Sequence, residues 1–235
     1  MKPRDLRKVM VRATKAVVER LSTSAGGSRP ANGESVVASA DHPDAPDRLP
    51  PRHVADARLL PDRGALASAL PAGGTVAEVG VASGDYAATI LAEASPAELH
   101  LIDVWDSERY GEAEMRRTTS RFRQQIDAGT VQVIRKPAVE ALSEFPDETF
   151  DWLYVDTSHT LRQTRRELDV ARRKVKPDGF IAGHDYCVGN PAEGLTYGVI
   201  PAVHAFCVEH GWRLAYLTLE TSAYRSFALT RMPGR

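Results

Sequence analysis

Residues 75–91 constrain the fold of this chain more than any other stretch. Residues 75–79 (TVAEV) have the β-branched and apolar character of a buried strand. Gly80 and Gly84 then bracket a short turn, where glycine permits positive φ and lets a ligand approach the backbone closely. From Asp85 the pattern becomes helical. Because the first N–H groups of a helix are unpaired, this turn suits the carboxylate or phosphate end of a ligand.

The two glycines alone do not identify that ligand. Ala82 and Asp85 break the dinucleotide fingerprint G-x-G-x-x-G, and the P-loop sequence is absent. Residues 98–103 form a second expected strand that ends on Asp103, 19 residues after Gly84. An acid at that place accepts hydrogen bonds from ribose hydroxyls. Dinucleotides and S-adenosylmethionine both fit, and an ordinary strand-to-helix turn stays an alternative for the glycines.

Strand-like and helix-like segments alternate along the chain, which predicts an α/β fold with a parallel sheet. The expected strands are residues 75–79, 98–103, 131–134, 150–155, 180–183, 212–219 and 224–231. The expected helices are residues 62–70, a segment from 85, residues 111–127, a segment from about 160, and residues 199–210. Ligands of such sheets bind outside the carboxyl ends of the strands. Asp103, Asp156 and the pair His184-Asp185 fall at such ends, so we expect the site there.

Four stretches, in this order, resemble the motifs of class I S-adenosylmethionine-dependent methyltransferases. They are residues 78–84 (EVGVASG), Asp103, residues 151–156 (DWLYVD) and residues 176–181 (KPDGFI). Residues 155–159 (VDTSH) and 183–186 (GHDY) resemble, more narrowly, a bacterial subfamily of sugar and small-molecule O-methyltransferases. That subfamily includes macrolide-sugar enzymes that use a divalent metal. The resemblance covers about residues 55 to 232. It implies a Rossmann-like sheet, mostly parallel with an antiparallel C-terminal edge, flanked by helices on both faces.

The resemblance also implies which residues hold the cofactor. The expected S-adenosylmethionine-binding residues are Glu78, Gly80, Ser83, Gly84, Tyr86, Asp103, Val104 and Trp105. Two interpretations of Trp105 are equal: its ring lies beside the adenine, or it lies in the core. Many enzymes of this class place a small acidic or hydroxyl pair after the third strand, near the adenine. This chain has Lys136 and Pro137 there instead.

Methyl transfer to a hydroxyl group needs a base, or a metal that makes the hydroxyl more acidic. Asp156 and Asp185 are hard oxygen donors that suit Mg²⁺, and His184 is a further expected ligand or a neighbour of the ion. Catechol O-methyltransferase-like enzymes hold a metal at these strand ends, with Asp-Asn where this chain has His184-Asp185. They place a catalytic Lys three residues after the first Asp, so His159 resembles a general base.

The expected catalytic residues are therefore His159 and Asp156, and the expected metal ligands are Asp156, His184 and Asp185. Structural roles remain as alternatives for three of them. Asp156 and His159 are also suited to capping a helix, and Asp185 is suited to a turn.

Composition divides the chain into three parts. Residues 1–21 have the pattern of a basic amphipathic helix. Residues 22–54 are rich in Ser, Gly and Pro, as in a linker or a lid, and residues 55–235 form the expected methyltransferase domain. The apolar stripe of the first helix needs cover, so we expect it to pack on the domain or in a homodimer rather than on a membrane.

Totals over the whole chain limit the classes of partner. Lys and Arg number 30 against 31 Asp and Glu, a net charge of −1 that argues against nucleic acid. No apolar run is long enough to span a membrane. The two cysteines form no C-x-x-C pair, which favours free thiols in the cytoplasm.

The sequence therefore predicts an S-adenosylmethionine-dependent O-methyltransferase, assisted by Mg²⁺, that acts on a hydroxyl of a sugar or another small polyol. An NAD-dependent oxidoreductase is the second hypothesis, opposed by the missing third glycine and the lack of any Tyr-x-x-x-Lys. A non-catalytic module that binds the adenosyl ligand is the third, opposed by the set Asp156, His159 and Asp185.

Overall fold

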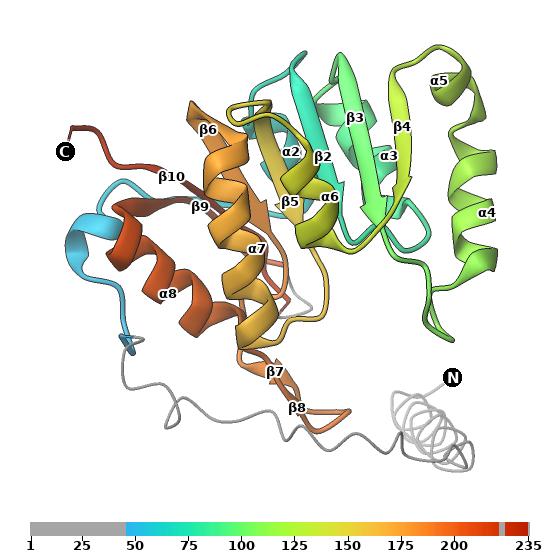
Figure 1. The fold of residues 1–235 in the computed structure, drawn as a ribbon. Helices are drawn as coiled ribbons and strands as arrows, with labels where there is room; N and C mark the ends of the chain where they lie inside the picture. The colour runs from blue at the N-terminus through green and yellow to red at the C-terminus, as the bar shows by residue number, and fades with distance from the viewer. Residues whose placement is uncertain (1–45, 221–223, 235) are drawn as a thin grey trace, which may run out of the picture. The chain divides into compact units, whose positions relative to one another are not determined.

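The computed structural model of the protein describes residues 46–220 and 224–234. The expected helix at residues 1–21 and residues 22–45 of the expected linker lie outside them. The described residues form one eight-stranded sheet, with helices on both faces, and a separate two-stranded hairpin (Figure 1).

The strand order in the sheet is β1-β9-β10-β6-β5-β2-β3-β4. β10 runs antiparallel to both of its neighbours, and all other neighbouring strands are parallel. The strands are β1 (Arg58–Leu60), β2 (Thr75–Val79), β3 (Glu98–Asp103), β4 (Val131–Arg135), β5 (Phe150–Val155), β6 (Val175–Gly183), β9 (Trp212–Thr218) and β10 (Phe227–Arg231). The predicted Rossmann-like sheet with antiparallel pairing at its C-terminal strands is confirmed, and β1 adds one parallel strand beyond β9.

Helices cover both faces of the sheet (Figure 1). One face carries α6 (Ala138–Glu144), α7 (Leu161–Lys174) and α8 (Val199–His210), and the other carries α2 (Arg63–Ala69) and α3 (Asp85–Glu93). Each face has its own apolar cluster, since successive residues of a strand point to opposite faces. Within β5, for example, Leu153 belongs to the cluster with α7 and Trp152 to the cluster with α3.

The single helix expected at residues 111–127 is divided in two. α4 (Glu112–Arg121) and α5 (Arg123–Asp127) meet at Phe122, which leaves the helical conformation and is buried. A Cβ atom at Gly84 would lie 2.7 Å from Cε2 of Phe122. The break thus packs an aromatic ring beneath the glycine turn, a tertiary contact that helical periodicity does not reveal.

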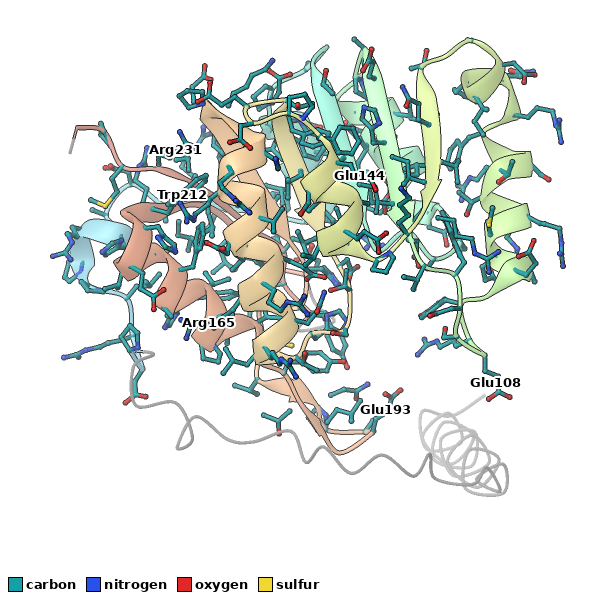
Figure 2. All side chains as sticks on the ribbon, viewed as in Figure 1. Glu108, Glu144, Arg165, Glu193, Trp212 and Arg231 are labelled. Carbon is teal, nitrogen blue, oxygen red and sulfur yellow. The ribbon has the colours of Figure 1, made fainter. Side chains whose placement is uncertain are left out.

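Three further elements differ from the expectation. The strand expected at residues 180–183 begins earlier, because β6 starts at Val175, which already pairs with Phe150. The loop before α8 contains a hairpin, β7 (Gly189–Asn190) and β8 (Leu195–Thr196), and Figure 2 places Glu193 at its tip. Neither this hairpin nor β1 was predicted, because strands of two or three residues are too short to show a period of two.

The described part of the expected linker packs on the domain. Residues Pro51–His53 form a short 3₁₀ helix, η2, and His53 is buried. Nδ1 of His53 is hydrogen-bonded to the carbonyl oxygen of Trp212 at 2.6 Å. The Trp212 ring lies 5.5 Å from the guanidinium carbon of Arg231, and both are labelled in Figure 2. No helix among residues 46–220 and 224–234 is long and apolar enough to cross a membrane.

Gly80 sits where the sheet most needs a residue without a side chain. Its φ is +90°, and a Cβ atom there would lie 1.9 Å from the carbonyl oxygen of Asp156. The turn after β2 therefore touches the end of β5, and only glycine allows that approach.

We expect Gly80→Ala to lower the free energy of unfolding by about 3 kcal/mol or more, since strain at positive φ and a backbone clash add together. Gly73→Ala is the matched control, because Gly73 also has positive φ but a Cβ atom added to it would meet no atom within 4 Å. Its cost should be about 1 kcal/mol, from strain alone. Denaturant titration of both variants measures the difference, and equal losses would show that the contact with Asp156 is not tight.

Candidate active site

The site lies where the order of the strands reverses. From β2 the chain continues on one side through β3 and β4, and on the other through β5 and β6. A parallel sheet has a crevice at such a point, beyond the carboxyl ends of the strands. The N–H of Gly80 donates to Ile102 O at 2.8 Å, and the N–H of Asp156 donates to Val79 O at 2.8 Å. These bonds fix the ends of β2, β3 and β5 side by side.

Asp103 holds the glycine turn in place. Its Oδ2 accepts hydrogen bonds from the N–H groups of Val81 (2.8 Å) and Ala82 (2.9 Å). Its Oδ1 accepts one from the N–H of Trp105 (3.0 Å). A carboxylate oxygen with one such bond can still accept another, for example from a ribose hydroxyl. Asp103 is thus both the support of the turn and an available acceptor beside it.

Trp105 lies in the core, which is the second of the two interpretations made from the sequence. The side chain is fully buried, and its Nε1 donates to Ala82 O at 2.9 Å. A bound adenine could not stack on this ring, because the ring has no exposed face. The carbonyl of the preceding Val104 accepts a hydrogen bond from Nε of Arg135 at 3.2 Å.

Glu78 lies at the end of β2 with a carboxyl oxygen that lacks a partner. The residue is 2 % exposed, and no atom of the described residues hydrogen-bonds to its Oε2. Burial raises the pKa of Glu78 well above its ordinary value, and the charge on Asp156 adds to this effect, whereas Arg63 opposes it. A buried carboxyl group of this kind is a suitable partner for a ligand that carries a positive charge.

Arg63, which the sequence did not point to, supplies a positive charge near this carboxyl group. Its guanidinium lies over the Tyr86 ring at 5.0 Å, and the Tyr86 hydroxyl donates to Arg63 O at 3.2 Å. Among the described residues no carboxylate lies within ion-pair distance of Arg63. Nothing in the sequence pattern marks the first residue of α2, because its place beside Tyr86 depends on the packing of α2 on α3.

The start of α3 is tied to α4 by charged contacts. The Ser83 hydroxyl donates to Asp85 Oδ2 at 2.8 Å, and Arg121 Nη1 donates to Asp85 Oδ1 at 2.6 Å. The Arg121 hydrogen bond, followed by that of Ser83, lowers the pKa of Asp85. Gly84 precedes the helix in the left-handed conformation. Of the expected cofactor-binding residues, Ser83 therefore has its hydroxyl engaged within the turn.

Two carboxylates and two imidazoles meet at the ends of β5 and β6. Asp156, His184 and Asp185 each offer one metal-ligand atom, and these atoms lie within 4.8 Å of one another. His159 Nε2 lies 3.1 Å from Asp185 Oδ2 and 3.9 Å from Asp156 Oδ1. The four residues that the sequence assigned to metal binding and catalysis are thus brought together.

The charges in this cluster act on one another. Burial raises the pKa of Asp156 and the nearby Asp185 adds to the rise, while His184 and His159 oppose it. Burial works against the charged form of His184, but the carboxylates of Asp185 and Asp156 outweigh it and raise the pKa of His184. A divalent cation would relieve the repulsion between the two carboxylates.

The backbone of the cluster is strained. His159 and Asp185 have positive φ values of +57° and +56°, which residues with side chains adopt at a cost. The N–H of Gly198 donates to His159 O at 2.7 Å, and the Tyr197 ring lies 4.9 Å from the His159 ring. Both contacts come from the base of the β7–β8 hairpin. This hairpin therefore helps to hold His159 in its unusual conformation.

A buried carboxyl group supports the same loop from inside. Glu167 is fully buried and accepts hydrogen bonds from Thr157 Oγ1 at 2.9 Å and Gln163 Nε2 at 2.8 Å. Burial raises the pKa of Glu167 to about 6. Thr157 lies between Asp156 and His159, so Glu167 anchors the segment that carries both. Sequence reasoning missed it, since a Glu in a helix is ordinarily exposed.

Tyr186 turns away from the cluster and into the core. Its hydroxyl is hydrogen-bonded to His204 Nε2 at 2.7 Å, and its ring lies 5.8 Å from that of Phe227. His204 Nδ1 in turn bonds to Pro46 O at 3.0 Å. Tyr186 thus has a structural role, whereas Tyr197 lies beside His159.

A cavity of about 660 Å³ lies at the opposite edge of the sheet, where β9 begins and α7 and α8 end. Arg172, Arg173, His210 and Trp212 are among its lining residues. Helix C-terminal carbonyls give that edge a negative potential that basic side chains offset. Arg231 Nη2, for example, donates to Arg172 O at 2.7 Å. The basic residues there therefore have a structural explanation.

Residues 77–186 match a family model described as a methyltransferase domain. No curated protein sequence matches this chain. All the cofactor, base and metal residues predicted from the sequence fall within residues 77–186. Residues 77–186 are therefore similar to the domain of S-adenosylmethionine-dependent methyltransferases, and the O-methyltransferase subfamily is not decided by this match.

Solved structures share the fold at low sequence identity. A Corynebacterium glutamicum protein is 17% identical, with a TM-score of 0.56 over 75% of this chain and 84% of that chain. The N-methyltransferase NodS of Bradyrhizobium japonicum is 14% identical, with a TM-score of 0.52 over 72% and 90%. A SAM-dependent methyltransferase from Aquifex aeolicus is 16% identical, with a TM-score of 0.50 over 68% and 83%. These likenesses support the fold and leave the acceptor open.

The buried Glu167 predicts a dependence of stability on pH. In the unfolded chain a Glu ionises near pH 4.5, whereas Glu167 in the folded protein keeps its proton until about pH 6. Wild-type stability should therefore fall as the pH rises through this window, by about 2 kcal/mol. Glu167→Gln cannot ionise, so its stability should lack that fall.

Urea titrations between pH 4 and pH 8 measure the difference between wild type and Glu167→Gln. Glu140→Gln, at an exposed position on α6, is the control and should follow the wild type. A Glu167→Gln curve parallel to that of the wild type would mean that Glu167 ionises as easily in the folded chain as in the unfolded one.

Proposed function

We propose that this protein transfers a methyl group from S-adenosylmethionine to a hydroxyl group of a sugar or another small polyol. One observation carries the proposal: His159 lies against Asp185, at 3.1 Å, on the same sheet edge as the glycine turn. A base beside the cofactor turn is what transfer to a hydroxyl group requires. We further propose His159 as that base and a divalent cation, such as Mg²⁺, beside it.

The cofactor would bind along the turn after β2. Asp103 would accept hydrogen bonds from the ribose hydroxyls. Glu78, whose Oε2 lacks a partner in the described chain, would accept the ammonium group of the methionine end. Arg63 would bind the carboxylate of that end. The opposite charges of Glu78 and Arg63 thus match the two charges of an amino acid.

The metal would be held by Asp156, Asp185 and His184. The side chains offer two carboxylates and one imidazole, a donor set that fits a divalent cation. When bound, such an ion makes an acceptor hydroxyl more acidic. His159 does not need to be one of its ligands, since its Nε2 already lies at hydrogen-bond distance from Asp185.

His159 would move the proton. Its Nε2, which faces Asp185, would carry the ring hydrogen, so its Nδ1 would take the proton of the acceptor hydroxyl. The imidazolium that forms would still face the carboxylates of Asp185 and Asp156 through Nε2. Opposite charges at this distance stabilise the protonated ring. The oxygen that has lost its proton would then form a bond to the methyl carbon, while the bond from that carbon to the sulfur of S-adenosylmethionine would break and leave S-adenosylhomocysteine.

The acceptor would lie against aromatic rings beside His159. The Tyr197 ring lies 4.9 Å from His159 and 6.5 Å from Tyr224. Aromatic rings pack well against the apolar faces of sugars. The sugar or polyol class itself comes from the resemblance of residues 155–159 and 183–186.

We propose the remaining features from composition. The protein would act in the cytoplasm on a small molecule, without nucleic acid or a membrane as its partner. Residues 1–21 would pair two copies in a homodimer, and residues 22–54 would act as a linker or lid.

Removal of the base should stop the reaction and leave the binding of the cofactor unchanged. We expect His159→Ala to reduce methyl release at least about 100-fold, the usual contribution of a general base. Its affinity for S-adenosylhomocysteine should stay unchanged. The assay uses a panel of sugars and polyols with a divalent cation, and His210→Ala is the control. Activity retained by His159→Ala would remove this residue from the mechanism, while activity unaffected by EDTA would remove the metal only.

The role of Arg63 has a separate test. Arg63→Ala should weaken the binding of S-adenosylhomocysteine by about tenfold or more, since a hydrogen bond to a charged group is lost. The same variant should bind 5′-methylthioadenosine, which lacks the amino-acid end, as the wild type does. Arg58→Ala, at an exposed arginine that also packs on a tyrosine, is the matched control for calorimetry. If the variant binds both ligands more weakly by the same factor, Arg63 does not contact the methionine end.

A further inference from the structure

An imidazole stands among the carboxylates of the candidate metal site. His184 directly follows β6, and its N–H donates to Val155 O at 3.1 Å, which fixes its backbone beside Asp156. Its Nδ1 lies 3.7 Å from Asp156 Oδ2 and 3.5 Å from Asp185 Oδ1. The imidazole therefore faces both carboxylates at once.

These separations are too long for direct hydrogen bonds, and they exceed those between ligands of one ion by only a few tenths of an ångström. An N–H···O hydrogen bond has a donor–acceptor distance of about 2.7 to 3.2 Å, which 3.5 and 3.7 Å exceed. Ligand atoms at about 2.1 Å from a shared ion lie about 3.0 to 3.4 Å apart. By contrast, His159 Nε2 is within hydrogen-bond range of Asp185, at 3.1 Å. Distance thus separates His184, whose Nδ1 is unpaired and available to an ion, from His159, whose Nε2 is paired with Asp185.

The burial of Asp185 is a second reason to expect a cation. The residue is 6 % exposed, and its side chain accepts no hydrogen bond from a hydroxyl or backbone amide of the described residues. A buried carboxylate that only imidazoles contact is costly unless a positive charge compensates it. His159 contacts one of its oxygens, Oδ2, and the other, Oδ1, is the one that faces His184.

We propose that this site prefers a divalent ion of the first transition series, such as Mn²⁺ or Co²⁺, over Mg²⁺, and that His184 is the residue responsible. Mg²⁺ favours oxygen ligands and gives up water reluctantly. An imidazole nitrogen in the donor set shifts affinity toward the later ions of the series. The inference rests on the metal-assisted reaction of the proposed function and names the class of ion. Water or acceptor oxygens complete the coordination.

The test is a metal titration of the full chain, with no cofactor or acceptor present. Calorimetry with Mg²⁺, Mn²⁺ and Co²⁺ compares wild type with His184→Asn, which replaces a nitrogen ligand by an amide oxygen. We expect the variant to lose Co²⁺ affinity at least about 100-fold, since even residues that only support a ligand contribute 10- to 100-fold. Its Mg²⁺ affinity should stay within about threefold, because the oxygen set is kept.

The change in selectivity, rather than the order of ions in the wild type, carries the inference. Many sites prefer Co²⁺ to Mg²⁺, and His210→Asn is therefore included as a control that should keep the wild-type order. The visible absorption of bound Co²⁺ and its effect on the ring-proton NMR signals of His184 in the wild type give independent readouts. They remain valid if His184→Asn or a second variant, His184→Gln, folds poorly.

Any of the following results would overturn the inference. Wild-type protein could bind Mg²⁺ as tightly as Co²⁺, His184→Asn could weaken both ions equally, or Co²⁺ could leave the His184 signals in place. Absence of any metal binding would also overturn it and would make His184 a charged partner of the carboxylates. Titration with S-adenosylhomocysteine distinguishes a failure of this inference from a failure of the proposed function. Cofactor binding without metal selectivity refutes this inference alone, and metal selectivity without cofactor binding refutes the proposed function alone.

Discussion

The close approach of Gly80 to the carbonyl oxygen of Asp156 joins the two halves of the site. A Cβ atom at Gly80 would lie 1.9 Å from that oxygen, so the turn after β2 and the end of β5 are in direct backbone contact. Glu78 and Asp103 lie on the turn's side of this contact, and Asp156 and His159 lie on the other. The reversal of strand order at β2 creates the crevice, and the contact sets the distance across it.

The carboxyl ends of the strands bring together acidic side chains that are buried and so lose the stabilisation that water would give them. Burial raises the pKa of both Glu78 and Asp156. A folded chain accepts such a cost where ligands compensate it, and perturbed groups in a cleft are typical of functional sites. The proposed ligands fit this requirement, because S-adenosylmethionine carries positive charge at its ammonium and sulfonium groups and a divalent cation carries two charges. Strain at His159 and Asp185 belongs to the same edge, and the hairpin base contacts His159.

The sequence predicted the fold and where the residues of the candidate site would lie, for physical reasons that particular residues show. Buried parallel strands such as residues 150–155 (FDWLYV) are largely apolar, so an acid that ends or follows such a strand stands out. Asp103, Asp156 and Asp185 could therefore be placed at one sheet edge from the sequence alone. Arg63 and Glu167 could not, because each depends on how one helix packs on its neighbours. Trp105 shows the reverse case: its position after Asp103 is consistent with an adenine contact, yet packing buries it.

Calorimetric titration with S-adenosylhomocysteine, alongside NAD, tests the central claim most directly. The claim is that the turn between Gly80 and Gly84, with Asp103 beneath it, binds the adenosyl and methionine parts of a methyl donor. We expect S-adenosylhomocysteine to bind in the micromolar range and NAD not to bind. Binding of NAD with no binding of S-adenosylhomocysteine would contradict it and would assign the turn to a dinucleotide.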